Sequence, residues 1–226
     1  MYSNLLQRLW DTGILQTGIW ETIYMTLLST LFSYIIGLPL GLLLSVTDKS
    51  GIHPVNWLSR IVGVIVNVFR SIPFIILMIA MLPVAKIVVG ESLGNKAMIV
   101  TLVIAAAPYI ARMVESSIKE VSFGVIEAAK AMGTSSLKIV MKVLIPEAKP
   151  SLIIGSVIST VTILGYSAMA GTIGGGGLGM IAITYGYQKY QDNITWLCVL
   201  LTVVIVQIIQ EVGMVVAHKT DKRIHR

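Results

Sequence analysis

A polar segment between two long apolar stretches holds the residues whose types and spacing most clearly indicate a function. It reads SFGVIEAAKAMGTSSLKIVMKVLIPEAKP and covers residues 122–150. Ala128 and Ala129 are small helix formers, so a helix that carries them can bring its backbone close to a partner. Glu127 adds a carboxylate to this helix. Gly133 can end it, because glycine readily takes the positive φ of a helix terminus.

A second short helix is expected directly downstream. Leu137, Val140, Met141 and Leu144 repeat at helical spacing, and Pro146 is expected to end the helix. Two short helices of this kind predict a docking site for another protein. A solvated amphipathic connector would show the same spacing, so the pattern alone leaves both readings open.

The rest of the chain offers little for catalysis or metal binding. The sequence contains no P-loop, no HExxH pattern and no paired aspartates within its apolar stretches. His53, His218 and His225 fall in expected loops or the tail. The single Cys198 lies in an apolar stretch, where packing is its usual role. We therefore expect no catalytic residue, no metal site and no cofactor bound by this chain.

The composition is that of a membrane protein. Charged residues make up 12% of the chain and hydrophobic residues 55%, with a mean hydropathy of +0.85, whereas a soluble domain carries about a quarter charged residues. Spanning about 30 Å of hydrocarbon takes about 20 residues of helix. The first apolar stretch is too long for a secretory signal peptide and lacks the flanking residues of one.

We expect an all-α integral membrane protein with five transmembrane helices. The expected spans are about 22–47, 61–85, 96–114, 150–171 and 194–217. The expected organisation is an amphipathic N-terminal segment at 1–17, a transmembrane domain at 18–217 with a loop at 119–149, and a basic tail at 218–226.

The distribution of lysine and arginine predicts the orientation, because loops that stay in the cytoplasm are richer in both. One side would carry twelve of them: Lys49, Arg60, Arg112, Lys119, Lys130, Lys138, Lys142, Lys149, Lys219, Lys222, Arg223 and Arg226. The other would carry four: Arg8, Lys86, Lys96 and Lys189. We expect the 119–149 loop and the C-terminus in the cytoplasm and the N-terminus outside. The net charge of +6 follows from this rule and requires no nucleic acid.

Polar residues inside the expected spans are candidates for a translocation pathway. Arg70 could contact Glu211 or a transported anion, or lie at the cytoplasmic interface. The fourth span is the most polar of the uncharged ones, and it carries the candidates Ser159, Tyr166, Ser167 and Met169. Small hydroxyl residues more often mediate helix packing, so the pathway assignment is a hypothesis.

A run of glycines follows the fourth span. Gly174, Gly175, Gly176 and Gly177 are consecutive, and such a run does not hold a regular helix well. Since no strand is expected before it, a nucleotide loop is disfavoured. We expect a broken-helix turn or re-entrant segment on the extracytoplasmic side, forming a gate or a turn.

The polar segment resembles the EAA loop of bacterial ABC importer permeases, in which Glu-Ala-Ala precedes a glycine and a later proline. Glu127, Ala128, Ala129, Gly133 and Pro146 match this pattern, with Val143 and Ile145 in place of the usual aliphatic pair. Together with NVFRSIPFIILMIAMLP, APYIARMVESSIKEV and AGTIGGGGLG, nearly the whole chain is similar to the methionine-uptake family of these permeases.

The resemblance implies a type I permease subunit that works as a homodimer in the bacterial cytoplasmic membrane and imports methionine. The implied partners are two cytoplasmic ATPase subunits, which use ATP and Mg²⁺, and an extracytoplasmic methionine-binding protein. In this family the EAA segment is the coupling helix that contacts the ATPase. A permease of the same fold for another solute, such as a polar amino acid or a phosphonate, is the alternative. A stand-alone channel or carrier is disfavoured, since neither pore-lining acids nor repeated halves occur.

Overall fold

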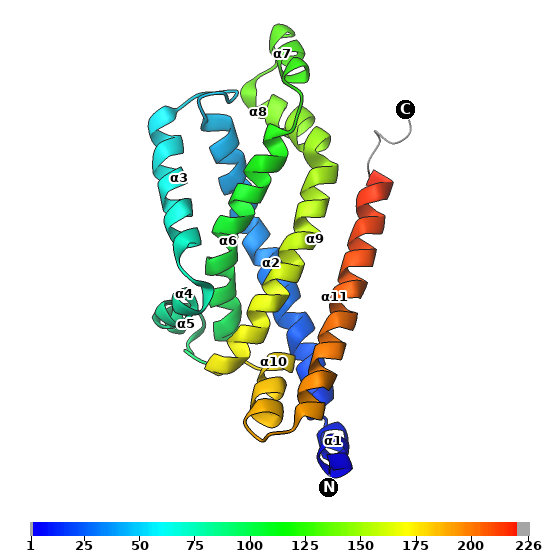
Figure 1. The fold of residues 1–226 in the computed structure, drawn as a ribbon. Helices are drawn as coiled ribbons and strands as arrows, with labels where there is room; N and C mark the ends of the chain where they lie inside the picture. Colours follow the sequence, from blue (N-terminus) through cyan, green and yellow to red (C-terminus); the bar gives the residue numbers. More distant parts are fainter. Residues whose placement is uncertain (1, 221–226) are drawn as a thin grey trace. The chain divides into compact units, whose positions relative to one another are not determined.

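The computed structural model describes residues 2–220, with the side chains of residues 2–6 left aside, and this part of the chain is helical without strands (Figure 1). The helices are α1 (Tyr2–Asp11), α2 (Ile14–Thr47), α3 (Asn56–Ser71), α4 (Phe74–Ala80), α5 (Leu82–Val89), α6 (Asn95–Lys119), α7 (Phe123–Ala131), α8 (Ser136–Ile139), the π-helix η1 (Val140–Leu144), α9 (Ile145–Ala170), the 3₁₀ helix η2 (Gly171–Ile173), α10 (Gly177–Ile181), the π-helix η3 (Ala182–Tyr187) and α11 (Asp192–Thr220).

Four helical stretches are long and apolar enough to cross a membrane: Ile14–Thr47, Asn95–Lys119, Ser136–Ile173 and Asp192–Thr220. The expected span at 61–85 differs, because α3 and α4 together pass the same test but are bent by 104°. Pro73 stands at the break. Proline lacks a backbone N–H and disfavours helical geometry in the residue before it. Length and composition therefore support four spans, or five if the bent pair is one.

The expected end of the second short helix at Pro146 is wrong. The chain continues as helix from α8 through η1 into α9, and Pro146 is the second residue of α9. Proline is tolerated in the first turn of a helix, and the π-helical turn before it already changes the pairing of the backbone. Pro150, the expected start of the fourth span, also lies inside α9.

The N-terminal segment is shorter than expected. α2 begins at Ile14, so the expected boundary at residue 17 falls inside a helix. Gly13, with φ of 74°, separates α2 from α1. On α1 the side chain of Leu9 is buried and that of Trp10 exposed, as an amphipathic segment requires. Of the basic tail, residues 221–226 lie outside the described residues.

The described chain forms two compact units. The first is built from the segments up to Phe32, Ile72–Ala105 and Thr160–Gln210. One of its cores joins α2, α4, α5, α6 and α9 through Met25, Met78, Ala85, Ala97, Met98, Ile99, Val103 and Ala170. The other joins α1, α2, α10 and α11 through Leu9, Leu15, Leu178, Ile181, Ile194 and Cys198.

The second unit is built from Ser33–Ser71, Ala106–Ser159 and the segment from Glu211 onward. Within it, α2 packs closely against α6 at two glycines four residues apart. A Cβ at Gly37 would stand 2.9 Å from the carbonyl oxygen of Ala107, and one at Gly41 would collide with the carbonyl of Ala111 and lie 2.6 Å from Val114. Small residues at this spacing allow helix backbones to approach each other in membranes.

Substitution of Gly41 by valine is expected to lower the thermal unfolding midpoint of the purified protein by about 5 °C, because overpacking costs about 1–3 kcal/mol. Gly165→Ala in α9 is the control, since a Cβ there meets nothing within 4 Å. Differential scanning fluorimetry in detergent measures both. Equal midpoints for Gly41→Val and wild type would contradict a backbone-close contact.

Candidate functional site

The Glu-Ala-Ala segment forms α7, and its end has a defined geometry. Gly133 takes a φ of 70°. Its N–H donates to the carbonyl of Lys130 over 2.9 Å, and the N–H of Thr134 donates to the carbonyl of Ala129 over 3.1 Å. This pair of bonds is a Schellman motif, in which a left-handed glycine ends the helix. The prediction that Gly133 terminates the helix is confirmed.

The outer surface of α7 and the segment after it is exposed and partly apolar. Glu127, Ala128 and Gly133 are exposed, whereas Ala129 is buried. Large apolar side chains stand out beside them: Phe123, Val125, Met132, Leu137 and Met141, with Met132 79% and Leu137 73% exposed. A Cβ at Gly133 would meet nothing within 4 Å. The surface therefore has the make-up of a contact face for another protein.

The inner side of α7 rests on other parts of the second unit. α7 contacts α8 and η1, and Leu144 of η1 and Ile139 of α8 are buried. Beneath α7 lies a hollow of about 180 Å³ whose lining includes Ser50, Ile52, Lys119, Ile126, Lys130 and Leu144. α7 is thus held at its base while its outer face remains free.

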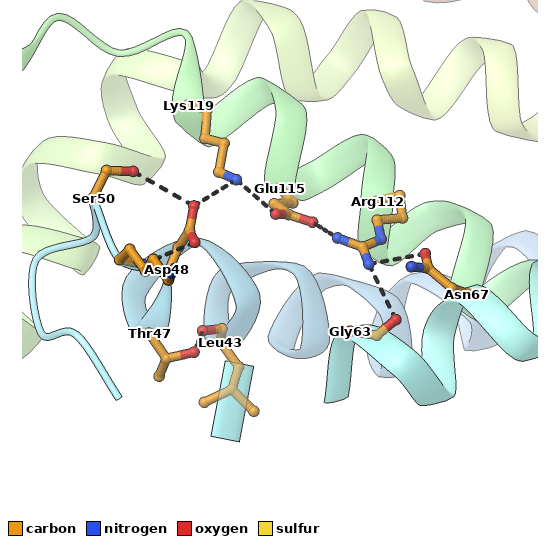
Figure 2. A network of polar contacts seen from close by, with 10 residues as sticks. Leu43, Thr47, Asp48, Ser50, Gly63, Asn67, Arg112, Glu115 and Lys119 are labelled. Carbon is orange, nitrogen blue, oxygen red and sulfur yellow. Dashed lines mark hydrogen bonds and ion pairs between the residues drawn. The ribbon is translucent and has the colours of Figure 1, made fainter. Parts of the chain in front are cut away.

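A chain of alternating charges lies where α6 leads into α7 (Figure 2). Lys119 Nζ lies 2.8 Å from Asp48 Oδ2 and 2.8 Å from Glu115 Oε1. The other carboxylate oxygen of Glu115 accepts a hydrogen bond of 2.6 Å from Nη1 of Arg112. Glu115, the least exposed of the four, therefore bridges both cations, and the four charges cancel.

The far end of this charge chain reaches α3. Nη2 of Arg112 donates to the carbonyl of Gly63 over 3.1 Å and to Oδ1 of Asn67 over 2.9 Å (Figure 2). The charge chain thus connects the segment after α2, helix α3 and the last turns of α6. Sequence reasoning missed Glu115 and Asp48. The spacing of Arg112, Glu115 and Lys119 at i, i+3 and i+7 could have indicated a shared helix face.

Asp48 lies just beyond the end of α2 and is the titratable group most affected by this arrangement. The hydrogen bond from Lys119 is the main cause that lowers the pKa of its carboxyl, with burial acting in the opposite direction. The backbone N–H of Lys49 and the hydroxyl of Ser50 also donate to the carboxylate. The ionised form is therefore favoured in the folded protein.

Arg70 lies near the C-terminal end of α3. It is the second-last residue of α3, about 21 Å along the helix from Asn56 at about 1.5 Å per residue, and its side chain is exposed. Within the described residues no ion pair joins it to Glu211.

The other pathway candidates have different surroundings. Ser159 and Ser167 are buried, with Ser159 donating to Sδ of Met113 over 3.4 Å and Ser167 to the carbonyl of Leu164 over 2.8 Å. The ring of Tyr166 stacks on that of Phe74, with centroids 4.1 Å apart. Met169 is 47% exposed. Ser159 therefore contacts α6 and Ser167 bonds within α9 itself, whereas the side chain of Met169 is partly exposed.

The glycine run breaks the helix as expected. After α9 the chain tightens into η2, Gly174 adopts a φ of 90° and Gly177 one of 88°, and α10 then begins. Gly174 and Gly177 therefore occupy left-handed conformations that side chains disfavour.

These features define a class of protein: a multi-pass helical membrane protein with a short exposed helix suited to docking on another protein. The family model of the binding-protein-dependent transport system inner membrane component matches residues 37–226. The chain belongs to this family. It is accordingly a permease component of the inner membrane rather than an enzyme.

Individual relatives agree with this assignment. The probable D-methionine transport system permease protein MetI of Vibrio cholerae is 43% identical over 94% of this chain and 95% of its own length. The D-methionine transport system permease protein MetI of Escherichia coli K12 is 50% identical over 70% of this chain and 73% of its own.

Solved structures show the same fold. A chain of the MetNI methionine ABC transporter in an inward-facing conformation matches with a TM-score of 0.91 and 45% identity, covering 92% of this chain and 97% of its own. A chain of an amino acid ABC transporter with histidines matches with a TM-score of 0.77 at 18% identity, which shows the fold alone. This is the type I permease fold that the sequence predicts.

Acidification is expected to weaken the charge chain. Folding lowers the pKa of Asp48. Its contribution to the free energy of unfolding is therefore complete above its ordinary pKa, near pH 4, and is lost as the pH falls through its pKa in the folded protein. Asp48→Asn should lower the thermal unfolding midpoint at about pH 7. Between about pH 7 and pH 3 the midpoint of this variant should fall less than that of the wild type. Asp11→Asn at the exposed end of α1 is the control. An unchanged pH dependence in Asp48→Asn would contradict this role.

Proposed function

We propose that this chain is the permease subunit of an ATP-driven importer of methionine, including its D-isomer and close derivatives. The relatives named for D-methionine transport, at 43% and 50% identity, support the substrate. The match to a chain of the MetNI methionine ABC transporter over 92% of this chain supports the mechanism.

The exposed face of α7 is the observation that carries the coupling role. Glu127, Ala128 and Gly133 present a carboxylate and two positions with little or no side chain, surrounded by exposed apolar groups. Such a helix fits a cleft on a partner, because its backbone can approach closely. Pro146, exposed in the first turn of α9, marks the end of this docking segment. The partner is a cytoplasmic ATPase subunit, which binds ATP and Mg²⁺.

The apolar helices support five crossings with the two ends on opposite sides. Four helical stretches are long and apolar enough to span a membrane, and α3 with α4 supplies the fifth if the bent pair is one span. With the excess of lysine and arginine around the 119–149 loop and the tail, the N-terminus lies outside and the C-terminus in the cytoplasm. The transmembrane domain begins with α2 at Ile14 and extends to about residue 217.

One chain supplies half of the pathway, and a second copy completes it. Ile154, Ile158 and Met169 on α9 are exposed, and Gly165 between them leaves open space for a neighbour. Tyr166 and Met169 on α9 are assigned to the translocation pathway, and Arg70 on α3 is a separate candidate for it. An extracytoplasmic methionine-binding protein delivers the substrate to the side of the Gly174–Gly177 turn.

Glu127→Ala and Gly133→Asp are each expected to reduce ATP-dependent methionine uptake about tenfold or more, because they change the centre of a docking face. The measurement is uptake of labelled methionine by proteoliposomes that contain the purified complex, together with the amount of ATPase that co-purifies. Gly133→Asp introduces a charge and meets no clash, but it also places a side chain at a φ of 70°, which strains the end of the helix, so Glu127→Ala is the variant whose effect reports on the partner.

Glu120→Ala is the matched control, since Glu120 is an exposed carboxylate before α7. Uptake of another solute, such as a polar amino acid or a phosphonate, by the wild-type complex would overturn the proposal that methionine is the substrate. It would leave the proposed coupling role intact. Full uptake in both α7 variants would overturn the coupling role.

A further inference from the structure

The turn after α9 is fastened by side chains from two distant helices of the first unit. Three successive backbone N–H groups, those of Gly176, Gly177 and Leu178, donate to side-chain oxygens. Their acceptors are Asn95 at the start of α6 and Glu21 and Thr22 on α2. None of these three side chains was singled out as a site by the sequence.

The bonds form a connected relay. Gly177 N–H donates to Oε2 of Glu21 over 2.8 Å, and Gly176 N–H donates to Oδ1 of Asn95 over 2.7 Å. The amide nitrogen of Asn95 donates to Oε1 of Glu21 over 2.8 Å. Each carboxylate oxygen of Glu21 therefore has its own donor, and Asn95 both donates and accepts. Thr22 adds the third bond, accepting from Leu178 N–H over 2.9 Å.

The glycines make this approach possible. A Cβ at Gly176 would collide with the carboxylate of Glu21. At Gly177 a Cβ would lie 2.8 Å from Thr22 Oγ1, and a side chain there would also be strained by the positive φ. The turn is anchored to the start of α6 a second time, because Gly94 N–H donates to the carbonyl of Gly174 over 3.0 Å.

The charge of Glu21 is directed at this turn. Among the described residues Glu21 takes part in no ion pair, and its hydrogen-bond partners are the amides of Asn95 and Gly177. Hydrogen bonds to an ionised acceptor are stronger than neutral ones. Because these bonds are partly buried, loss of an acceptor would also leave a backbone donor unpaired.

The geometry points to Glu21 and Asn95 as positioning residues that fix the glycine turn during transport. They act on the backbone of the turn and need no contact with the solute. This role goes beyond the proposed function, because it concerns how the extracytoplasmic turn is held rather than which solute passes.

An exchange of the two side-chain chemistries tests the relay. Glu21→Gln keeps one acceptor and cannot satisfy both donors, while Asn95→Asp sets two carboxylates against each other. In the double variant, glutamine at 21 can accept from Gly177 and donate to aspartate at 95, whose other oxygen accepts from Gly176. All three bonds are then restored with the charge moved. Glu91→Gln is the control, since Glu91 is exposed and close to Asn95 in sequence.

Amide hydrogen exchange in the assembled complex, read by mass spectrometry on peptides that cover residues 174–181, reports on these N–H groups directly. Each single variant is expected to speed exchange there by about tenfold or more, with peptides of α7 unchanged, and the double variant to return it to the wild-type rate. Methionine uptake should fall and recover in parallel.

The role would be overturned by unchanged exchange in the single variants, by fast exchange that persists in the double variant, or by fast exchange with normal uptake. Faster exchange throughout the chain in the single variants would also overturn it, since the contact would then support the whole fold. If the wild-type complex does not take up methionine, the proposed substrate is wrong. The exchange rates still test whether Glu21 and Asn95 hold the turn.

Discussion

A backbone that crosses a bilayer must satisfy its polar groups without water, and an irregular segment within a span has to meet that constraint. A regular helix satisfies these groups with hydrogen bonds within its own backbone. Where the helix stops after α9, Glu21, Thr22 and Asn95 supply the missing acceptors.

Polar side chains therefore have different tasks in the two units. In the first, a carboxylate and an amide bind backbone N–H groups and hold a turn. In the second, two carboxylates bind cations and hold helices together where the chain leaves α6 for α7. α7 is consequently attached to a base held by these contacts, and Glu127 and Ala128 on it are exposed.

Sequence reasoning reached the all-helical class, the glycine turn and the termination of α7 at Gly133, because each depends on local residue types. It placed the end of a helix at Pro146, because a proline inside a helical pattern looks the same whether it ends one helix or opens the next. The bend at Pro73 was missed for a related reason: hydropathy reports apolar length and not direction. Glu21 and Asn95 lie 74 residues apart, and such a pairing leaves no periodic trace.

The charge chain Asp48, Lys119, Glu115 and Arg112 has an electrical consequence. Moving one elementary charge through a potential of 100 mV involves about 2.3 kcal/mol. Two positive and two negative groups joined in a row sum to zero, so a joint displacement of the four along the membrane normal does no net work against the membrane voltage. Under the proposed coupling role of α7, the base that carries this helix can therefore be displaced without work against the membrane voltage.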